Sequence, residues 1–401
     1  MRVKVNTTKK TKVEEKNTPK KTFKLLLRTL FKNDAVVEAK NTPWYIAALL
    51  FFLSITLSVI PPVVGAATEK GSYIINNETY QMDVGLEAFS KFIYSNNINF
   101  EVKNVEVEEK DANGIVISKV MKNQLTLTDI SLSNWNSRTK TIEDTQTQST
   151  IHYYEYVMIN SNNVEIPKLR VFYVGGDYDI NGYSAAYKFF MDNSIFGITH
   201  KEENKTVKPA SMVVLGTHEI FMAVYSSAAK ANSEYSGNSF RGDYSRMDAS
   251  KGIKLHTLLL NENASDADIE GANNFTLDKK SEAWADTITE SKWVGFLNEA
   301  YSITRMNNTL MMFSLIGGIN AIIIIVFGFT LWILTRGKRN PNNTIKLGET
   351  LTMSCISSVS PAILSLVVGF LFPSFATLSF MLFASFRLMW LSMKTLRPIE
   401  N

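Results

Sequence analysis

Two uncharged stretches near the C-terminal end constrain the fold of this chain more than any other feature. The first covers residues 306–335 and is followed by a basic segment at 336–339. The second covers residues 350–386 and contains no Asp, Glu, Lys or Arg. Because a membrane-spanning helix needs about 20 apolar residues, both stretches predict helices that cross a membrane.

The second stretch is too long for a single span. A straight helix over 350–386 would measure roughly 55 Å, whereas the hydrocarbon core of a bilayer is about 30 Å thick. Pro373 lies near its middle, where proline favours a turn. The sequence therefore predicts one span at 306–335, a basic loop at 336–349, two further spans at 350–372 and 374–393, and a tail at 394–401.

A further apolar stretch, 43–64, begins with Trp44 and Tyr45 and ends near Pro61. Trp and Tyr favour the membrane interface, so this stretch predicts the first span. The alternative is a signal peptide cleaved near Ala67. Since the segment before Trp44 is much longer than the charged region of a signal peptide, we favour a retained span.

The charges are divided unevenly along the chain. Residues 1–42 carry 12 Lys or Arg against 4 Asp or Glu, whereas residues 67–306 carry 23 against 32. Lys and Arg are enriched in cytoplasmic segments, and with four spans both chain ends and the loop at 336–349 fall on one side. The sequence thus predicts a multi-pass plasma-membrane protein with cytoplasmic N- and C-termini and an extracytoplasmic domain at 65–305.

The N-terminal region divides into a disordered basic tail, 1–19, and an amphipathic helix with a linker, 20–42. Apolar and basic residues alternate at helical spacing in the helix: Phe23, Leu26, Leu27, Leu30 and Phe31 against Lys20, Lys21, Lys24, Arg28 and Lys32. This pattern predicts a helix in the membrane interface that binds anionic lipid headgroups. The alternative is a helix packed on a partner protein or on the chain's own spans. Nucleic acid is not expected, because the neighbouring span brings lipid closer.

The domain at 65–305 has the mixed pattern of an α+β fold. Apolar periodicity predicts helices at 83–95, 183–193 and 217–231, and a further helical pattern runs from 279 towards the second span. Alternating or continuous apolar runs predict strands at 100–107, 114–121, 125–130, 151–159, 168–174 and 212–215. Stretches rich in small polar residues, 131–149 and 232–250, predict loops. Cys355 is the only cysteine, so no disulfide can form within the chain.

One segment of this domain resembles the start of a calcium-binding loop. Asp177, Asp179 and Asn181 offer oxygen ligands at alternate positions, and Gly182 permits the turn. The twelfth position should be Glu, but it is Lys188, whose charge would oppose a cation. We therefore favour a turn without metal. A weaker match occurs at 266–271.

Catalytic chemistry has no signature in the sequence. The four histidines lie outside metal-ligand spacings, and nucleophile-elbow, phosphate-loop and dinucleotide motifs are absent. The sequence thus predicts a non-enzymatic protein without a cofactor.

Three features of the predicted spans bear on helix packing. Gly317, Gly318 and Gly328 would allow close helix contacts, and Pro361 should kink the third span. Arg387 lies in the fourth span, where it either reaches towards the cytoplasm with Lys394 and Arg397 or lines a polar cavity.

Two regions resemble a known family. The stretch 23–31, leading into a span that ends near Pro61, and the stretch 358–366 resemble the bacterial membrane family that includes the maltodextrin-utilisation protein MalA. The resemblance covers the two ends of the chain and implies an accessory protein or scaffold of a sugar transport system, with transporter subunits as partners. It implies no site residues.

Two other functions stay open. The order of amphipathic helix, span, large outer domain and three spans is similar to that of MacB/FtsX-like permeases, which work with a separate ATPase. In that class the segment between the second and third spans couples to the ATPase, and here 336–349 lacks its acidic and apolar pattern. The third possibility is an extracytoplasmic receptor for a solute or a partner.

Overall fold

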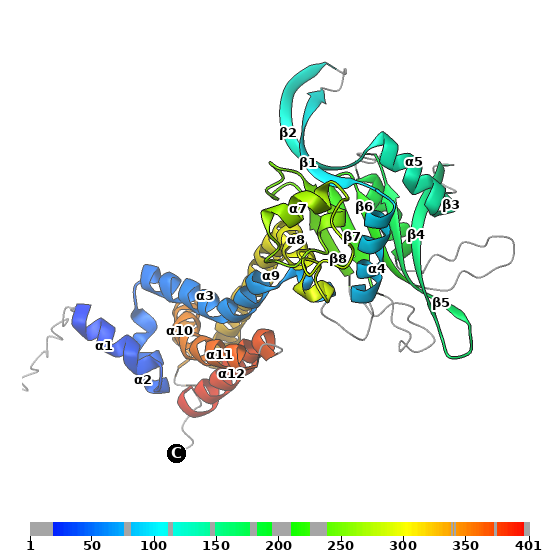
Figure 1. The fold of residues 1–401 in the computed structure, drawn as a ribbon. Helices are drawn as coiled ribbons and strands as arrows, with labels where there is room; N and C mark the ends of the chain where they lie inside the picture. The colour runs from blue at the N-terminus through cyan, green and yellow to red at the C-terminus, as the bar shows by residue number, and fades with distance from the viewer. Residues whose placement is uncertain are drawn as a thin grey trace, which may run out of the picture. The chain divides into compact units, whose positions relative to one another are not determined.

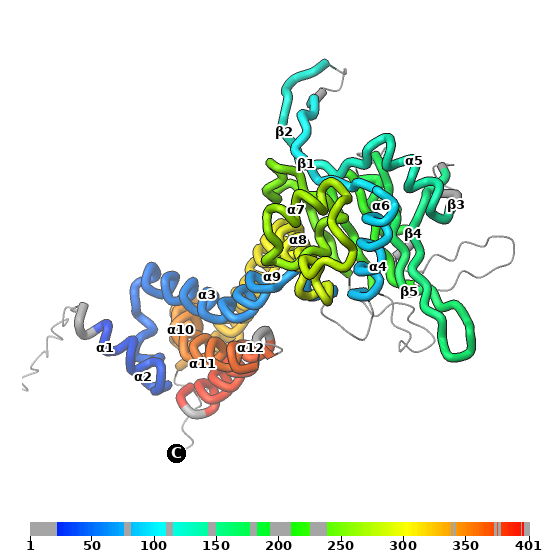
Figure 2. Tube along the Cα trace, in the orientation of Figure 1, coloured from blue at the N-terminus to red at the C-terminus, as the bar shows by residue number. Residues whose placement is uncertain are grey.

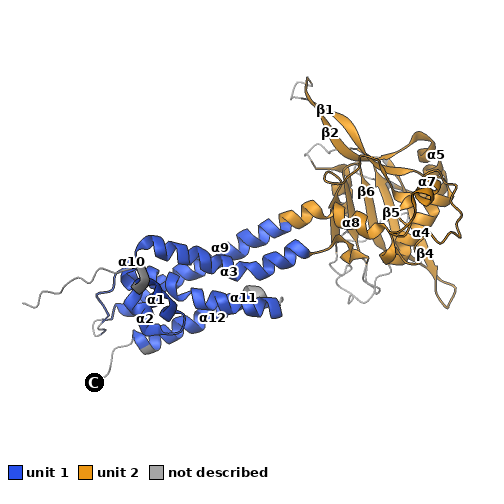
Figure 3. Ribbon diagram, turned by 60° about the vertical axis from the view of Figure 1, so that its left-hand side comes forward, with its two compact units in different colours: residues 1–68, 308–401 blue, residues 69–307 orange. Residues whose placement is uncertain are grey.

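The computed structural model describes residues 19–75, 82–110, 115–144, 149–176, 183–194, 210–224, 239–337, 340, 342–372 and 375–396. The chain divides into two compact units, one formed by Met1–Thr68 with Asn308–Asn401 and the other by Glu69–Asn307 (Figure 3). We call them the helical unit and the α+β unit, and each is described by itself.

The helical unit is built from the two ends of the chain (Figure 1). Its described elements are α1 (Pro19–Thr29), α2 (Asn33–Glu38), η1 (Ala39–Asn41), α3 (Trp44–Thr68), most of α9 (Ser302–Thr335), α10 (Leu347–Ser357), α11 (Val359–Leu371), α12 (Ala376–Trp390) and a π-helical turn (Leu391–Thr395). Within the described residues, three stretches are long and apolar enough to cross a membrane: Trp44–Thr68, Ser302–Thr335 and Leu347–Leu371. They indicate a multi-pass membrane protein. A shorter apolar stretch, Leu378–Met393, follows them.

Proline affects two of these helices differently. Helix α3 continues through Pro61 and Pro62 to Thr68, four residues beyond the predicted end of the first span at residue 64. Proline removes only one backbone donor, and membrane helices tolerate it where neighbouring groups replace the lost bond. The third stretch is interrupted at Ser358, as expected, because Pro361 has no N–H to donate to the carbonyl of Ser357.

Hydrogen bonds from side-chain hydroxyl and amide groups connect the three long apolar stretches. Asn320 Nδ2 of α9 donates to Ser58 Oγ of α3 at 2.8 Å, and Ser358 Oγ, between α10 and α11, donates to Ser54 Oγ at 2.9 Å. Ser354 Oγ donates to the Ile324 carbonyl at 2.5 Å. All five side chains are buried, and we call them the polar seam. Because a polar group without a partner is costly in an apolar environment, these bonds favour one register of the helices.

Arg387 of α12 contacts the N-terminal part of the chain. Its Nη2 donates at 2.6 Å to the carbonyl of Thr29, the last residue of α1. The last carbonyls of a helix have no partner within it and carry partial negative charge, which attracts a cation. Arg387 therefore connects α12 to the end of the amphipathic segment.

The α+β unit contains two sheets and several helices. Its described strands are β1 (Phe100–Lys110), β2 (Val116–Leu127), β3 (Lys140–Asp144), β4 (Ser149–Ile159), β5 (Glu165–Val174), β6 (Ser211–Gly216), β7 (Glu219–Ala223), β8 (Ser239–Asp243) and β9 (Ile253–Lys254). Its described α-helices are α4 (Met82–Ser95), α5 (Asp129–Arg138), α6 (Ala185–Ser194), α7 (Asp266–Asn273) and α8 (Trp293–Ala300).

The larger sheet carries a hydrophobic cluster on each face. Among the described strands its order is β3-β4-β5-β6-β7-β8, antiparallel except for the parallel pair β5 and β6. Leu169 and Val171 of β5 pack into the cluster that includes α4 and α8, whereas Phe172 and Val174 pack into the cluster that includes α6. Alternate residues of one strand therefore supply two cores.

The smaller sheet has the order β2-β1-β9, and its long β1–β2 hairpin extends away from the rest of the unit (Figure 2). β1 pairs with β9 only at Glu101 and Val102. Beyond that point Ile117 and Met121 of β2 are exposed.

Within the α+β unit the predicted secondary structure holds for α4, α6 and strands β1, β4, β5 and β6, and strand type is also correct over most of β2. Two predicted elements differ in type or position. The predicted helix at 217–231 contains strand β7, and its residues after 224 lie outside the described part of the chain. Ile220 and Met222 pack in one cluster and Phe221 and Ala223 in the other, which gives a continuous apolar run. Such a run does not distinguish a buried strand from a helix.

The remaining corrections concern loops and boundaries. The predicted strands 114–121 and 125–130 form one strand, β2, and the predicted loop 131–149 holds most of α5, all of β3 and the first residue of β4. The predicted loop 232–250 contains β8. The helical pattern from 279 produces only a short 3₁₀ turn, Ile288–Glu290, before α8, and α9 begins afresh at Ser302.

Candidate functional site

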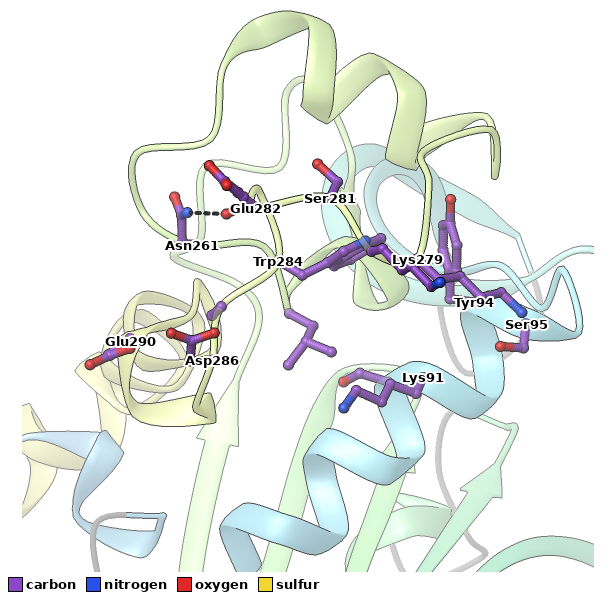
Figure 4. Close-up of a pocket in the computed structure, with 14 residues that line it drawn as sticks. Lys91, Tyr94, Ser95, Asn261, Lys279, Ser281, Glu282, Trp284, Asp286 and Glu290 are labelled. Atoms are coloured by element: carbon purple, nitrogen blue, oxygen red, sulfur yellow. Dashed lines mark hydrogen bonds between the residues drawn. The ribbon is translucent and has the colours of Figure 1, made fainter.

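A pocket of about 750 Å³ lies in the α+β unit between α4 and the segment 279–290 (Figure 4). The lining residues come from three separate parts of the sequence: Ser90, Lys91, Tyr94 and Ser95; Leu259 and Asn261; and Lys279, Lys280, Ser281, Glu282, Trp284, Ala285, Asp286 and Glu290. Its volume falls within the range of roughly 300–1,000 Å³ that is typical of small-molecule sites.

Helix α4 forms one wall of the pocket, because one of its faces is buried in the core and another is exposed. Leu86, Phe89 and Ile93 recur at helical spacing and are buried in the main core of the unit. This packing leaves Lys91 and Ser95 exposed towards the pocket. The Lys91 ammonium is already paired, since it donates to Glu87 Oε1 one turn earlier at 2.5 Å.

The opposite wall has no regular secondary structure over most of its length but is held by backbone hydrogen bonds. The amide of Asn261 donates to the Ala283 carbonyl at 2.9 Å, and the amide of Ala285 donates to the Leu259 carbonyl at 2.9 Å. Asn261 Nδ2 also donates to the Glu282 carbonyl at 3.2 Å. The wall segment is thus attached along its length to residues 259–261.

Two aromatic rings lie in the pocket between these walls. Tyr94 and Trp284 meet edge to face, with ring centroids 4.9 Å apart. Each is fixed by a hydrogen bond to the backbone just before the segment 279–290: Tyr94 Oη donates to the Leu277 carbonyl at 2.7 Å, and Trp284 Nε1 donates to the Asp278 carbonyl at 2.9 Å. The pocket therefore has an ordered aromatic surface.

A buried histidine lies behind this surface. His256 is fully buried and stacks on Phe275, with ring centroids 4.1 Å apart, and Phe275 in turn contacts Tyr94. Burial, together with the charge of Lys254, lowers the pKa of His256 to about 3. The imidazole is therefore neutral at physiological pH and adds no charge behind the pocket.

Charges of opposite sign occupy different sides of the pocket. Figure 4 shows Glu282, Asp286 and Glu290 on one side of Trp284, and Lys279 on the other. Together with Lys280, these side chains form no ion pair with any residue that the structure describes. The site can therefore offer a ligand an aromatic surface, an anionic wall and a cationic wall.

The predicted calcium loop cannot be compared with this pocket. Asp177, Asp179 and Asn181 lie outside the described residues, so their role stays a prediction. The weaker match at 266–271 is the beginning of α7. There Asp268 forms a capping box with Ser265, which is the ordinary use of these residue types at a helix start. Among the described residues, no group of three or more His, Cys, Asp or Glu is placed to hold a metal ion.

The pocket itself was missed by sequence reasoning. Trp284 was assigned to a helical pattern, whereas it lies in the extended wall and forms an isolated bridge with Leu260. No local motif links α4 with residues 279–290, because their proximity results from the packing of the domain. Comparison with protein-family models, with curated proteins and with solved structures finds no match to this chain.

Proposed function

We propose that the protein crosses the plasma membrane four times, with both chain ends in the cytoplasm and the α+β unit outside. The three long apolar stretches supply three spans. The fourth would be α12 with the π-helical turn, a 15-residue helix and a 5-residue turn that together approach the length of about 20 residues needed to span the membrane. The Lys- and Arg-rich segments 1–42 and 336–349 then face the cytoplasm, and so does the C-terminal end of the fourth span, where Lys394 and Arg397 occur.

Within this topology we infer an accessory or receptor role in transport. The single observation that supports it is the pocket of about 750 Å³ in the α+β unit, which is lined by aromatic and charged side chains. The α+β unit would bind a solute outside the cell, and the helical unit would hold it beside a transport complex. A sugar transport system of the maltodextrin type is the partner implied by the family resemblance.

The loop between α9 and α10 favours this role over an ATP-driven permease. Its described residues are tied to their own chain: Asn340 Nδ2 donates to the carbonyls of Leu334 and Leu396 at 3.2 and 3.1 Å. Arg336 donates to the carbonyls of Asn343, at 3.2 Å, and Ile345. These bonds attach the described residues of the loop to the chain itself, which supports a structural use of this part of the loop.

Helix α1 is proposed to lie on the cytoplasmic surface of the membrane. Phe23 and Leu27 are exposed on successive turns of α1, at 65% and 48%, and Phe31, two residues beyond the end of the helix, is 84% exposed. Exposed Lys24 and Arg28 lie one residue further along. An exposed apolar stripe beside a basic stripe fits the boundary between acyl chains and anionic headgroups.

Cysteine accessibility tests the topology. Single cysteines replace the exposed residues Asn41, Ser137 and Asn343 in a Cys355→Ser background, and intact cells are treated with a membrane-impermeant maleimide. Only the Ser137→Cys variant should react before the cells are opened, and all three should react afterwards. Labelling of the Asn343→Cys variant in intact cells would refute the four-span topology.

Purification of the tagged full-length protein tests the role. After mild solubilisation, co-purified proteins are identified by mass spectrometry, with the same tag on an unrelated four-span protein as the control. Enrichment of the membrane subunits of a solute transporter supports the accessory role. A stoichiometric ATPase without such subunits would instead support the permease class, and a protein recovered alone would contradict association with a transporter.

A further inference from the structure

We propose that the pocket of the α+β unit binds a zwitterionic solute with a free ammonium and a free carboxylate, namely an amino acid or a short peptide. The proposal rests on the role of this unit as a solute-binding module and specifies the chemistry of what it binds. It follows from the arrangement of charge, aromatic surface and hydrogen-bonding groups around one cavity.

The charged side chains of the pocket are suited to a ligand that carries both a positive and a negative charge. Three carboxylates, from Glu282, Asp286 and Glu290, line the side of the pocket opposite Lys279. Glu282, Asp286, Glu290 and Lys279 are all exposed, so their charges are accessible to a solute that enters the pocket. The two signs lie apart, and a neutral solute would use neither charge fully. A solute with a cation at one end and an anion at the other would satisfy both walls.

The middle of the pocket is suited to the uncharged part of such a ligand. Between the charged sides lies the half-buried ring of Trp284, which offers an apolar surface and packs against the buried ring of Tyr94. This surface suits the side chain or Cα of an amino acid residue. The hydroxyls of Ser95 and Ser281 line the same cavity and can bind the peptide groups of a longer ligand. A volume of about 750 Å³ has room for more than a single small amino acid.

Isothermal titration calorimetry on the purified full-length protein in detergent tests the proposal. The probes are alanine, tri-alanine, N-acetyl-tri-alanine amide and maltotriose. Tri-alanine should bind, and blocking both of its charges should weaken binding at least about tenfold, because a hydrogen bond to a charged group contributes a factor of that size. Alanine binding as tightly as tri-alanine would identify a free amino acid as the ligand, whereas weaker binding would identify a peptide.

Substitutions of the acidic and of the basic side chains test whether each set contributes to ligand binding. The double variant Glu282→Gln/Asp286→Asn should bind tri-alanine at least about tenfold more weakly, and Lys279→Gln/Lys280→Gln should do the same. Glu262→Gln and Lys251→Gln, exposed charges that do not line the pocket, should leave binding unchanged. Because the blocked probe uses the unaltered protein, the test does not depend on whether a variant folds.

The pH dependence of binding gives an independent readout. The α-amino group of a peptide has a pKa of about 8, so raising the pH from 7 to 9.5 removes the positive charge of the ligand. Binding of tri-alanine should weaken over that interval, whereas binding of the blocked probe should not change.

Three outcomes would overturn the inference. The first is equal binding of the free and blocked peptides. The second is binding of maltotriose that is insensitive to the wall variants. The third is no binding of any probe at millimolar concentration. None of them bears on the topology or on the co-purified partners, so the proposed function would stand or fall on its own experiments.

Discussion

The two units bury different kinds of polar groups. In the α+β unit, Arg170 Nε and Glu155 Oε1 form a nearly buried ion pair at 2.8 Å, with side-chain exposures of 4% and 9%. In the described part of the helical unit the buried polar side chains are neutral, and most are Ser, Thr or Asn. In the topology proposed above, water would surround the first unit and lipid would cover the outer face of the second, where an ionised group is far more costly.

The two units also reach close packing by different means. The α+β core is filled by large aromatic side chains, including Phe89, Phe100, Trp135 and Trp293. The helical unit instead brings backbones together at small residues, as where Gly328 of α9 meets Leu351 of α10. Removal of apolar area from water drives the first kind of packing, whereas contact between helices in lipid depends on close fit and on hydrogen bonds. The expected effects of mutation therefore differ between the units.

The largest effect should follow from breaking the buried ion pair. Arg170→Met leaves the Glu155 carboxylate with only the exposed partner Lys140, and such a loss costs about 3–5 kcal/mol in the free energy of unfolding. Urea unfolding of the full-length protein, followed by near-UV circular dichroism, measures it. The double variant Glu155→Leu/Arg170→Met should recover most of the loss. Lys119→Met, which breaks an exposed pair with Glu106, should change little, and an equal effect at both sites would contradict the comparison.

Close packing in the helical unit is tested at two glycines of α9. A methyl group at Gly328 would lie 2.6 Å from Leu351 Cδ2 and 3.1 Å from its Cα, whereas one at Gly318 meets nothing within 4 Å. Overpacking of this kind costs about 1–3 kcal/mol, so Gly328→Ala should destabilise the protein and Gly318→Ala should not. Thermal unfolding in mild detergent gives the readout. Of the three glycines predicted to allow close contact, Gly328 is thus expected to matter most.

The neutral histidine of the α+β unit should make its stability depend on pH. The pKa of His256 is lowered to about 3 in the folded protein, against about 6.5 when unfolded, so the unfolded chain binds more protons between these values. The free energy of unfolding therefore keeps its full value above pH 6.5 and decreases as the pH falls towards 3. At pH 5 the decrease is about 2 kcal/mol.

Replacement of the histidine provides the measurement. The unfolding free energies of the wild type and His256→Phe are compared at pH 8 and pH 5, and the wild type should lose about 2 kcal/mol more. His152→Phe, at a half-buried position, serves as the matched control. Parallel pH profiles for the wild type and His256→Phe would show that His256 is not the group responsible.

The smallest effect is expected from the polar seam. The hydrogen bond from Asn320 to Ser58 joins two helices, and such bonds in membrane proteins contribute about 0.6 kcal/mol on average. A double-mutant cycle with Ser58→Ala and Asn320→Ala should give a coupling of that size. Thr330 donates within its own helix to Val326, so a cycle pairing Thr330→Ala with Ser58→Ala should give none. A coupling of several kcal/mol would mean that the seam resembles the ion pair in strength.

The sequence by itself determined the features that depend on the length and hydropathy of one segment and on the spacing of apolar residues within it. The uncharged runs specify the apolar helices, because length and hydropathy are properties of a single segment. Helices α4 and α6 and strands such as β1 follow from their own periodicity. The interruption at Ser358 follows from Pro361 alone.

Tertiary structure decided what depends on contacts between distant segments. Strand β7 packs into a hydrophobic cluster on each of its two faces. The position of Arg387 depends on its hydrogen bond to the carbonyl of Thr29, which comes from the opposite end of the chain. The pocket needs α4 and the segment 279–290 to meet, although neither carries a motif for binding. The energy of such contacts comes from burial and hydrogen bonding across the fold, and periodicity within one segment does not encode them.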